Sequence, residues 1–419
     1  MRKFSAISLY TGAGGLDYGF EAAGFRTAVA VEMDQRCAET IRLNRKWSVI
    51  NDDISAVATA DILAKAKLRR READILIGGP PCQPFSKAGF WATGSTKRLQ
   101  DPRASTLENY LRVLEDAKPR TFLLENVEGL GFRGKDEGLK YFRSRLQAIN
   151  ARQRTNYVLS TAVLNAVDYG VPQLRRRLFI VGCREGRSFI FPGATHVAAD
   201  ELLGDRQRHL TAWDALRSIR VLKSEHESLR LRGKWADLLP TIPEGQNYLW
   251  HTQRGGGQPL FGWRRRYWSF LLKLSKNAPS WTISAQPGPA TGPFHWDNRR
   301  LSVREMARLQ TFPAIRLAGS HSDCQRQLGN AVPSLLAEIL AREIGAQLLG
   351  RSIRGGYALS IDPSKTAPPL AIAPAPVPTR YLSLRGDHDA HPGTGKGYRA
   401  SLRSASFGSN AQEVFELGS

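Results

Sequence analysis

Residues 74–86 read DILIGGPPCQPFS, and this stretch decides which fold the sequence predicts. Its short apolar run, bounded by turn-forming glycines and prolines, predicts a buried strand. Prolines on both sides of Cys82 restrict the backbone around that thiol, which we expect on a loop just past the strand. A lone cysteine is more often a small buried apolar residue, and this is our interpretation of the other three, Cys37, Cys183 and Cys324. The position of Cys82 instead favours a functional thiol.

The same order of strand, turn and helix occurs on both sides of this stretch. Upstream, residues 5–10 (SAISLY) predict a strand, which the turn TGAGG and a short amphipathic helix follow. Further apolar runs predict strands before Glu32 and Glu125 and over residues 178–181. Strands that alternate with helices are typical of an open parallel sheet, in which polar residues gather at the carboxyl ends of the strands. We therefore predict an α/β fold with its site at that edge.

A unit of different composition follows the predicted sheet. From about residue 186 to 300 the chain is rich in Gly, Trp, Arg and Pro, which predicts a smaller, loop-rich, basic module. Helical patterns return at residues 302–309 and 332–349. Residues 355–419 are Pro/Ala-rich and then Ser/Gly-rich, and such a composition buries little apolar area. We predict a mobile, disordered tail there.

The composition restricts the partners and the compartment. The 419 residues include 60 Lys+Arg against 38 Asp+Glu, a formal net charge of +22 that favours a polyanion such as nucleic acid over a mere solubility charge. No stretch approaches the ~18 consecutive apolar residues of a membrane span, so we expect a cytoplasmic protein with no membrane partner. The four cysteines lie far apart without metal-binding spacing, so we expect free thiols and no metal.

Two acidic residues mark a possible nucleoside site. Glu32 lies twenty residues after Gly12 of the glycine-rich turn, where an acid can hold ribose hydroxyls, and Asp53 could accept a hydrogen bond from an adenine amino group. A dinucleotide fingerprint would need a third glycine where this chain has Asp17, which disfavours NAD. The alternative for each acid is a solvated carboxylate at a strand end.

A basic segment, QLRRR at residues 173–177, enters the strand at 178–181. In an extended chain Gln173, Arg175 and Arg177 point to one face. Guanidinium groups there would lower the pKa of a neighbouring thiol and bind a carbonyl oxygen, and Glu125 would bring a carboxyl group beside the thiol. The alternative is a solvated basic edge.

Taken together, these motifs resemble the cytosine-C5 DNA methyltransferase family over about residues 1–345. They occur in the family's usual order: TGAGGLDYGF, the acid in VEMDQ, DDI, GGPPCQPFS, ENVEGL, DYGVPQLRRRLFIVG, RRLSVREMARLQTFP and QLGNAVP. The resemblance implies a Rossmann-like S-adenosylmethionine-dependent methyltransferase sheet, with the smaller module as a target-recognition domain. It divides the chain into a catalytic domain at residues 1–185, completed by 320–350, and the target-recognition domain with its hinge at 186–319.

The resemblance also implies the roles of individual residues. Cys82 is the expected nucleophile, Glu125 engages N3 and the amino group of cytosine, and Arg177 holds O2 with Arg175 in support. The expected S-adenosylmethionine pocket is lined by Tyr10, Gly12, Gly14, Leu16, Glu32, Asp53, Pro80 and Asn330. Tyr10 departs from the phenylalanine common in the family but keeps the ring. The stretch from Gln83 to about residue 101 would be a loop that closes over the bound base.

The implied substrate is double-stranded DNA, because a cytosine flipped out of the duplex would reach the thiol. We expect DNA contacts from Gln83, Ser86, Arg254, Arg264, Arg265 and Arg266, and most tryptophans in the module's core. The resemblance further suggests a nucleoid-associated monomer of a restriction-modification system whose endonuclease acts separately. An RNA-directed member of the same family that modifies tRNA stays an alternative, as does a catalytically silent DNA-binding regulator.

Overall fold

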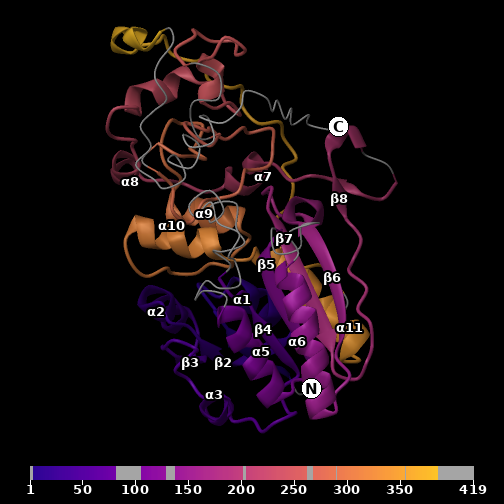
Figure 1. The fold of residues 1–419 in the computed structure, drawn as a ribbon. Coiled ribbons are helices and arrows are strands. Elements are labelled where there is room, and N and C mark those ends of the chain that lie inside the picture. Colours follow the sequence, from indigo (N-terminus) through magenta and orange to yellow (C-terminus); the bar gives the residue numbers. More distant parts are fainter. Residues whose placement is uncertain are drawn as a thin grey trace, which may run out of the picture.

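The computed structural model describes residues 3–81, 105–128, 137–201, 204–261, 268–288, 290–353 and 355–385. Its centre is a seven-stranded sheet in the order β3-β2-β1-β4-β5-β7-β6 (Figure 1). The strands are β1 Phe4–Leu9, β2 Phe25–Val31, β3 Ser48–Ile50, β4 Ile75–Gly78, β5 Thr121–Val127, β6 Val158–Asn165 and β7 Arg176–Cys183. The helices that accompany the sheet are α1 Gly15–Ala22, α2 Gln35–Asn44, α3 Thr59–Ala66, α5 Ser105–Ala117, α6 Glu137–Gln153 and α11 Ser334–Leu348. No helix within these ranges is long and apolar enough to cross a bilayer.

The direction of the strands corrects one prediction. The five strands from β3 to β5 are parallel, as expected, but β7 lies antiparallel between β5 and β6. The expectation of an all-parallel sheet was therefore wrong at this end, and β6 was not predicted. Only residues 166–175 join β6 to β7, which is too short for the helical crossover that a parallel pair needs.

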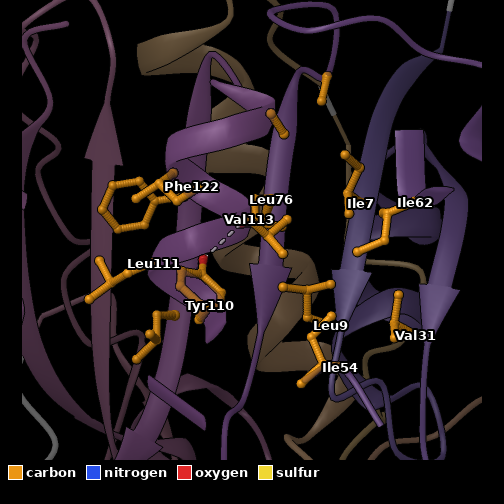
Figure 2. Packing of buried hydrophobic residues seen from close by; sticks show 14 of the residues in the cluster. Ile7, Leu9, Val31, Ile54, Ile62, Leu76, Tyr110, Leu111, Val113 and Phe122 are labelled. Atoms are coloured by element: carbon orange, nitrogen blue, oxygen red, sulfur yellow. Dashed lines mark hydrogen bonds between the residues drawn. The ribbon is translucent and has the colours of Figure 1, made fainter. Parts of the chain in front are cut away.

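One face of the sheet is covered by α3, α5 and α6 through a continuous apolar core. Figure 2 shows side chains from β1, β2, β4 and β5 meeting those of α3 and α5. Tyr110 of α5 is fully buried there, and its hydroxyl donates to the carbonyls of Leu76 at 3.2 Å and Leu123 at 3.0 Å. This tyrosine therefore ties α5 to both β4 and β5, the strands that lead to the predicted site.

The other face is covered by α1 and α11, which come from opposite ends of the domain's sequence. Gly15 and Gly19 make this close approach possible: a Cβ at Gly15 would lie 2.3 Å from the carbonyl oxygen of Val332, and one at Gly19 would lie 2.4 Å from the Cβ of Ala337. The C-terminal helix thus returns to pack on the glycine-rich N-terminal unit.

The module after β7 has little regular structure but its own apolar core. Its elements are β8 His196–Val197, β9 Gln207–Arg208, α7 Ala212–Leu216 and α8 Lys223–Ser228, and the helices α9 Val303–Leu309 and α10 His321–Asn330 lead back to the sheet (Figure 1). Trp235 packs against the rings of Phe261 and Phe270 in this core. The glycine run at 255–257 wraps around Trp250, because a Cβ at Gly256 would lie 2.5 Å from that ring.

Residues 355–385, named here the C-terminal strap, differ from the predicted mobile tail. The strap runs from the sheet domain to the module, and the backbone N–H of Ser364 donates to Asp214 at 2.6 Å. Farther along, Tyr381 is 2% exposed and stacks on Trp235 with ring centroids 6.0 Å apart. Buried Ile361 is a second anchor. A few apolar residues therefore order a segment whose average composition suggests disorder.

Candidate active site

The carboxyl ends of β1, β2, β4 and β5 lie at one edge of the sheet, as predicted for parallel strands. Cys82 itself lies outside the described residues, but the backbone that leads to it is fixed from two sides. The side chain of Asn126 donates to the carbonyl of Pro80 at 3.2 Å, and the hydroxyl of Thr106 donates to that of Pro81 at 3.2 Å. The approach to Cys82 is therefore held between β5 and α5.

Glu125 is the buried carboxyl group at this edge. It is 7% exposed, and its Oε1 lies 3.0 Å from Nε of Arg177. A Cβ on Gly79 would lie only 2.9 Å from its Oε2. Glycine at position 79, three residues before Cys82, thus lets the β4 loop lie directly against the carboxyl group.

The electrostatics of this pair leave Glu125 able to hold a proton. Burial raises the pKa of Glu125, and the positive charges of Arg177 and Arg175 only partly oppose that effect. Burial also lowers the pKa of Arg175 well below its ordinary value, with the charge of Arg177 acting in the same direction. A raised pKa favours the protonated carboxyl group, which can donate a hydrogen bond or a proton.

Several buried polar atoms of Arg175 and Gln173 have no hydrogen-bond partner among the described residues. Arg175 is 1% exposed, and its Nη2 donates to the carbonyl of Gly329 at 2.8 Å. Its Nε and Nη1, and both amide atoms of the fully buried Gln173, lack a partner among the described residues. Arg176 instead is exposed and pairs with Glu128 at 2.8 Å, as the alternation of an extended chain requires. Unpaired buried polar groups indicate a place for a polar ligand or ordered water.

The predicted nucleoside site is organised around Glu32, which is 8% exposed. Its Oε2 accepts the backbone N–H of Gly12 at 2.7 Å, and its Oε1 accepts that of Asp34 at 2.8 Å. Burial raises the pKa of Glu32, while the two N–H groups oppose the shift. Each oxygen keeps a lone pair that could accept from a ribose hydroxyl. A direct hydrogen bond thus joins the glycine-rich turn to the acid.

The other residues predicted for this pocket lie around the same turn. Tyr10 donates through its hydroxyl to the carbonyl of Thr106 at 2.7 Å. Burial raises the pKa of Tyr10, and the charge of nearby Asp53 adds to the rise. Gly14, with φ of 87°, caps the start of α1, in which Leu16 is buried. Asn330 is exposed at the end of α10, next to the Gly329 carbonyl that Arg175 contacts.

Asp17, noted in the sequence only as a departure from a dinucleotide fingerprint, is fully buried. It accepts from the hydroxyls of Ser8 and Thr27 at 2.9 Å each, and burial raises its pKa to about 6. Asp17 therefore fastens α1 to β1 and β2 instead of facing a pyrophosphate. No group of residues in the described ranges gathers three His, Cys, Asp or Glu side chains as a metal site would.

Most of the residues predicted to contact DNA lie outside the described ranges. Arg254 is exposed on the module. The remaining candidates lie outside the described residues: Gln83, Ser86, Arg264, Arg265 and Arg266. Sequence reasoning missed Gly79 and Asn126, although their positions beside Cys82 and Glu125 could have indicated both.

Comparisons with known proteins identify the family of the chain. The sequence model of the family described as C-5 cytosine-specific DNA methylase matches residues 4–346. The Type II methyltransferase M.SacI of Streptomyces achromogenes is 39% identical over 374 residues, which cover 83% of this chain and 94% of the relative. M.NgoFVII of Neisseria gonorrhoeae is 32% identical over 346 residues, which cover 82% and 86%. The solved structure of the S. pombe Dnmt2 methyltransferase matches with a TM-score of 0.55 at 17% identity, covering 82% of this chain and 99% of that one.

The strand order, and the glycine-rich turn that follows the first strand, give the chain the Rossmann-like α/β fold of methyltransferases such as S. pombe Dnmt2. Because the family match extends over most of the sequence, the chain belongs to the C-5 cytosine-specific DNA methylase family and is a DNA cytosine-C5 methyltransferase. The resemblance of its motifs is thereby confirmed.

Proposed function

We propose that this enzyme methylates a cytosine that has left the DNA helix and is bound covalently through Cys82. The observation that carries the proposal is the ion pair of buried Glu125 with partly buried Arg177. Gly79 lets the loop that leads to the thiol lie directly against this carboxyl group. The pair offers an acid and a cation within one buried site, the two groups that a cytosine needs at N3 and O2 during nucleophilic addition.

The chain's own residues account for the activation of the base. The thiolate of Cys82 forms a bond to C6, and the electron pair of the C5–C6 double bond moves to C5. Glu125 donates its proton or a hydrogen bond to N3, which stabilises the ring as charge develops, and Arg177 binds O2. S-adenosylmethionine, when bound, would supply the methyl group to C5 and leave as S-adenosylhomocysteine. Loss of the C5 proton to water restores the double bond and expels the thiolate.

Residues around the glycine-rich turn fit the methyl donor. Glu32 suits ribose hydroxyls, because its oxygens are fixed by backbone N–H groups and still have acceptor capacity. Tyr10 and Leu16 offer apolar surface, and Asp53 an acceptor, near the end of β1 at the same edge of the sheet. Pro80 and Asn330 would complete the pocket from the β4 loop and from α10.

Contacts with double-stranded DNA must offset the cost of flipping, which is a few kcal/mol. The net charge of +22 favours phosphate contacts, to which Arg254 and the basic run at residues 264–266 would contribute. Gln83 and Ser86 would contact DNA from the loop that follows Cys82. Because the relatives are named Type II methyltransferases, we propose a restriction-modification role, with the endonuclease acting separately. Flipping one base per event requires only a monomer.

Transfer of labelled methyl groups tests the proposal. The purified chain should label duplex DNA and leave total tRNA unlabelled, and bisulfite sequencing of DNA from cells that express it should show one recurring site. Cys82→Ser should abolish transfer while DNA binding stays measurable. Preferential labelling of tRNA, or near-normal turnover by the serine variant, would overturn the proposal.

A further inference from the structure

Two tryptophans of the module are not part of its core. Trp268 is 46% exposed and Trp281 is 39% exposed, and they are the only exposed tryptophans in the described ranges. Their rings contact each other edge to face, with centroids 4.3 Å apart and an interplanar angle of 69°. Two large indoles side by side in solvent are an unfavourable arrangement for a surface that contacts nothing.

The Trp268–Trp281 pair lies next to the segment that leads into β7. The residues on both sides of Trp281 bind Leu174: Ser280 accepts its N–H at 2.8 Å, and the hydroxyl of Thr282 donates to its carbonyl at 2.6 Å. Leu174 is the direct neighbour of Arg175 in the sequence. Trp268 is anchored in the module, because its carbonyl accepts from the side chain of Asn247 at 2.7 Å. The pair therefore lies where the module meets the active-site segment.

The chemistry of the pair fits nucleic acid bases. Indole rings stack on any base, and a DNA surface suits a chain with a net charge of +22. A duplex that has released its cytosine into the site leaves one guanine without a pairing partner. We propose that the Trp268–Trp281 pair stacks on this unpaired guanine and so stabilises the flipped state. The inference rests on the proposed function, since it requires that the cytosine leaves the helix.

A thermodynamic cycle between protein and DNA tests the inference. Affinity is measured for a duplex with the methylated site and for the same duplex with an abasic residue in place of that guanine. Trp281→Ala and Trp268→Ala should each weaken binding to the intact duplex roughly 5- to 100-fold, the range of aromatic–base stacking. On the abasic duplex the variants should bind within about twofold of the unmodified chain, because the stacking partner is gone.

Matched variants separate this effect from damage to the fold. Trp281→Phe keeps a ring and should retain most of the affinity, and Ile190→Ala removes a 75% exposed side chain elsewhere and should change nothing. All variants should bind S-adenosylmethionine normally. Unchanged affinity in both alanine variants, or an equal loss on both duplexes, would overturn the inference. If the unmodified chain forms no covalent complex with 5-fluorocytosine DNA, the proposed function fails instead.

Discussion

Gly79→Ala tests how closely the loop before Cys82 lies against the carboxyl group of Glu125, to which we assign the role of the acid. The added methyl would lie 2.9 Å from Oε2 of Glu125, whereas ordinary contacts of a Cβ begin near 3.4 Å. Either the carboxyl group or the loop must therefore move by about 0.5 Å. Arg177 holds the other oxygen of Glu125 at 3.0 Å, so the displacement disturbs the acid and its partner together.

The expected result is a slower chemical step in a folded enzyme. Misplacement of a reacting group by 1 Å can cost on the order of 100-fold in rate, so we expect a fall of roughly 10- to 100-fold in the single-turnover rate of methyl transfer. Backbone strain should not contribute, because the φ angle of Gly79 is not in the left-handed region. Thermal unfolding and binding of S-adenosylmethionine should change little.

A control with the same chemical change is available at Gly193. A Cβ there would meet nothing within 4 Å, so Gly193→Ala should transfer methyl groups at the unmodified rate. If Gly79→Ala retains a rate within twofold of the unmodified chain, the contact between loop and carboxyl group does not matter for catalysis. A large loss of stability without a slower rate would mean that Glu125 serves the fold.

Three further predictions concern the fold and the donor pocket. Burial raises the pKa of Asp17 to about 6 in the folded chain, against about 4 when unfolded, so its contribution is fully present below pH 4 and is lost as pH rises through 6. The contribution of Asp17 to the free energy of unfolding, measured in denaturant titrations as the difference between the unmodified chain and Asp17→Asn, should fall by about 3 kcal/mol across that window; a difference that does not change with pH would contradict this. Glu32→Gln would turn an amide N–H₂ group toward a backbone N–H, so calorimetry should show S-adenosylmethionine binding weakened roughly 10- to 100-fold, and equal affinity would exclude the role. Tyr381→Ala removes a buried ring from the C-terminal strap, so amide exchange over residues 355–385 should accelerate by an amount equivalent to about 3 kcal/mol, and unchanged exchange would show that the ring does not anchor the strap.

The sequence predicted those parts of the fold that repeat a local pattern. The parallel strands that lead to site residues are apolar runs with polar residues at their carboxyl ends. Glu32 and Glu125 could therefore be placed at one edge of the sheet from this pattern alone. Strand direction is not contained in such a pattern. The antiparallel β7 follows from the short connection after β6, and β6 was not predicted.

The remaining differences come from contacts between distant residues. Nothing local indicates that Glu125 would lie against Gly79 or that Arg175 would bind the carbonyl of Gly329, because these contacts join separate strands and helices. The average composition of the C-terminal strap predicted disorder. Single apolar residues such as Tyr381, which packs against Trp235, instead hold this polar segment against the module.

Covalent trapping tests the central claim most directly. In a duplex with 5-fluorocytosine at the methylated position, fluorine replaces the C5 proton whose loss would release the enzyme. The adduct should therefore accumulate in the presence of S-adenosylmethionine. We predict a stable complex of chain and DNA whose cross-linked peptide contains Cys82, and none with Cys82→Ser. Methyl transfer to ordinary DNA without any such complex, or a cross-link at another residue, would contradict the account.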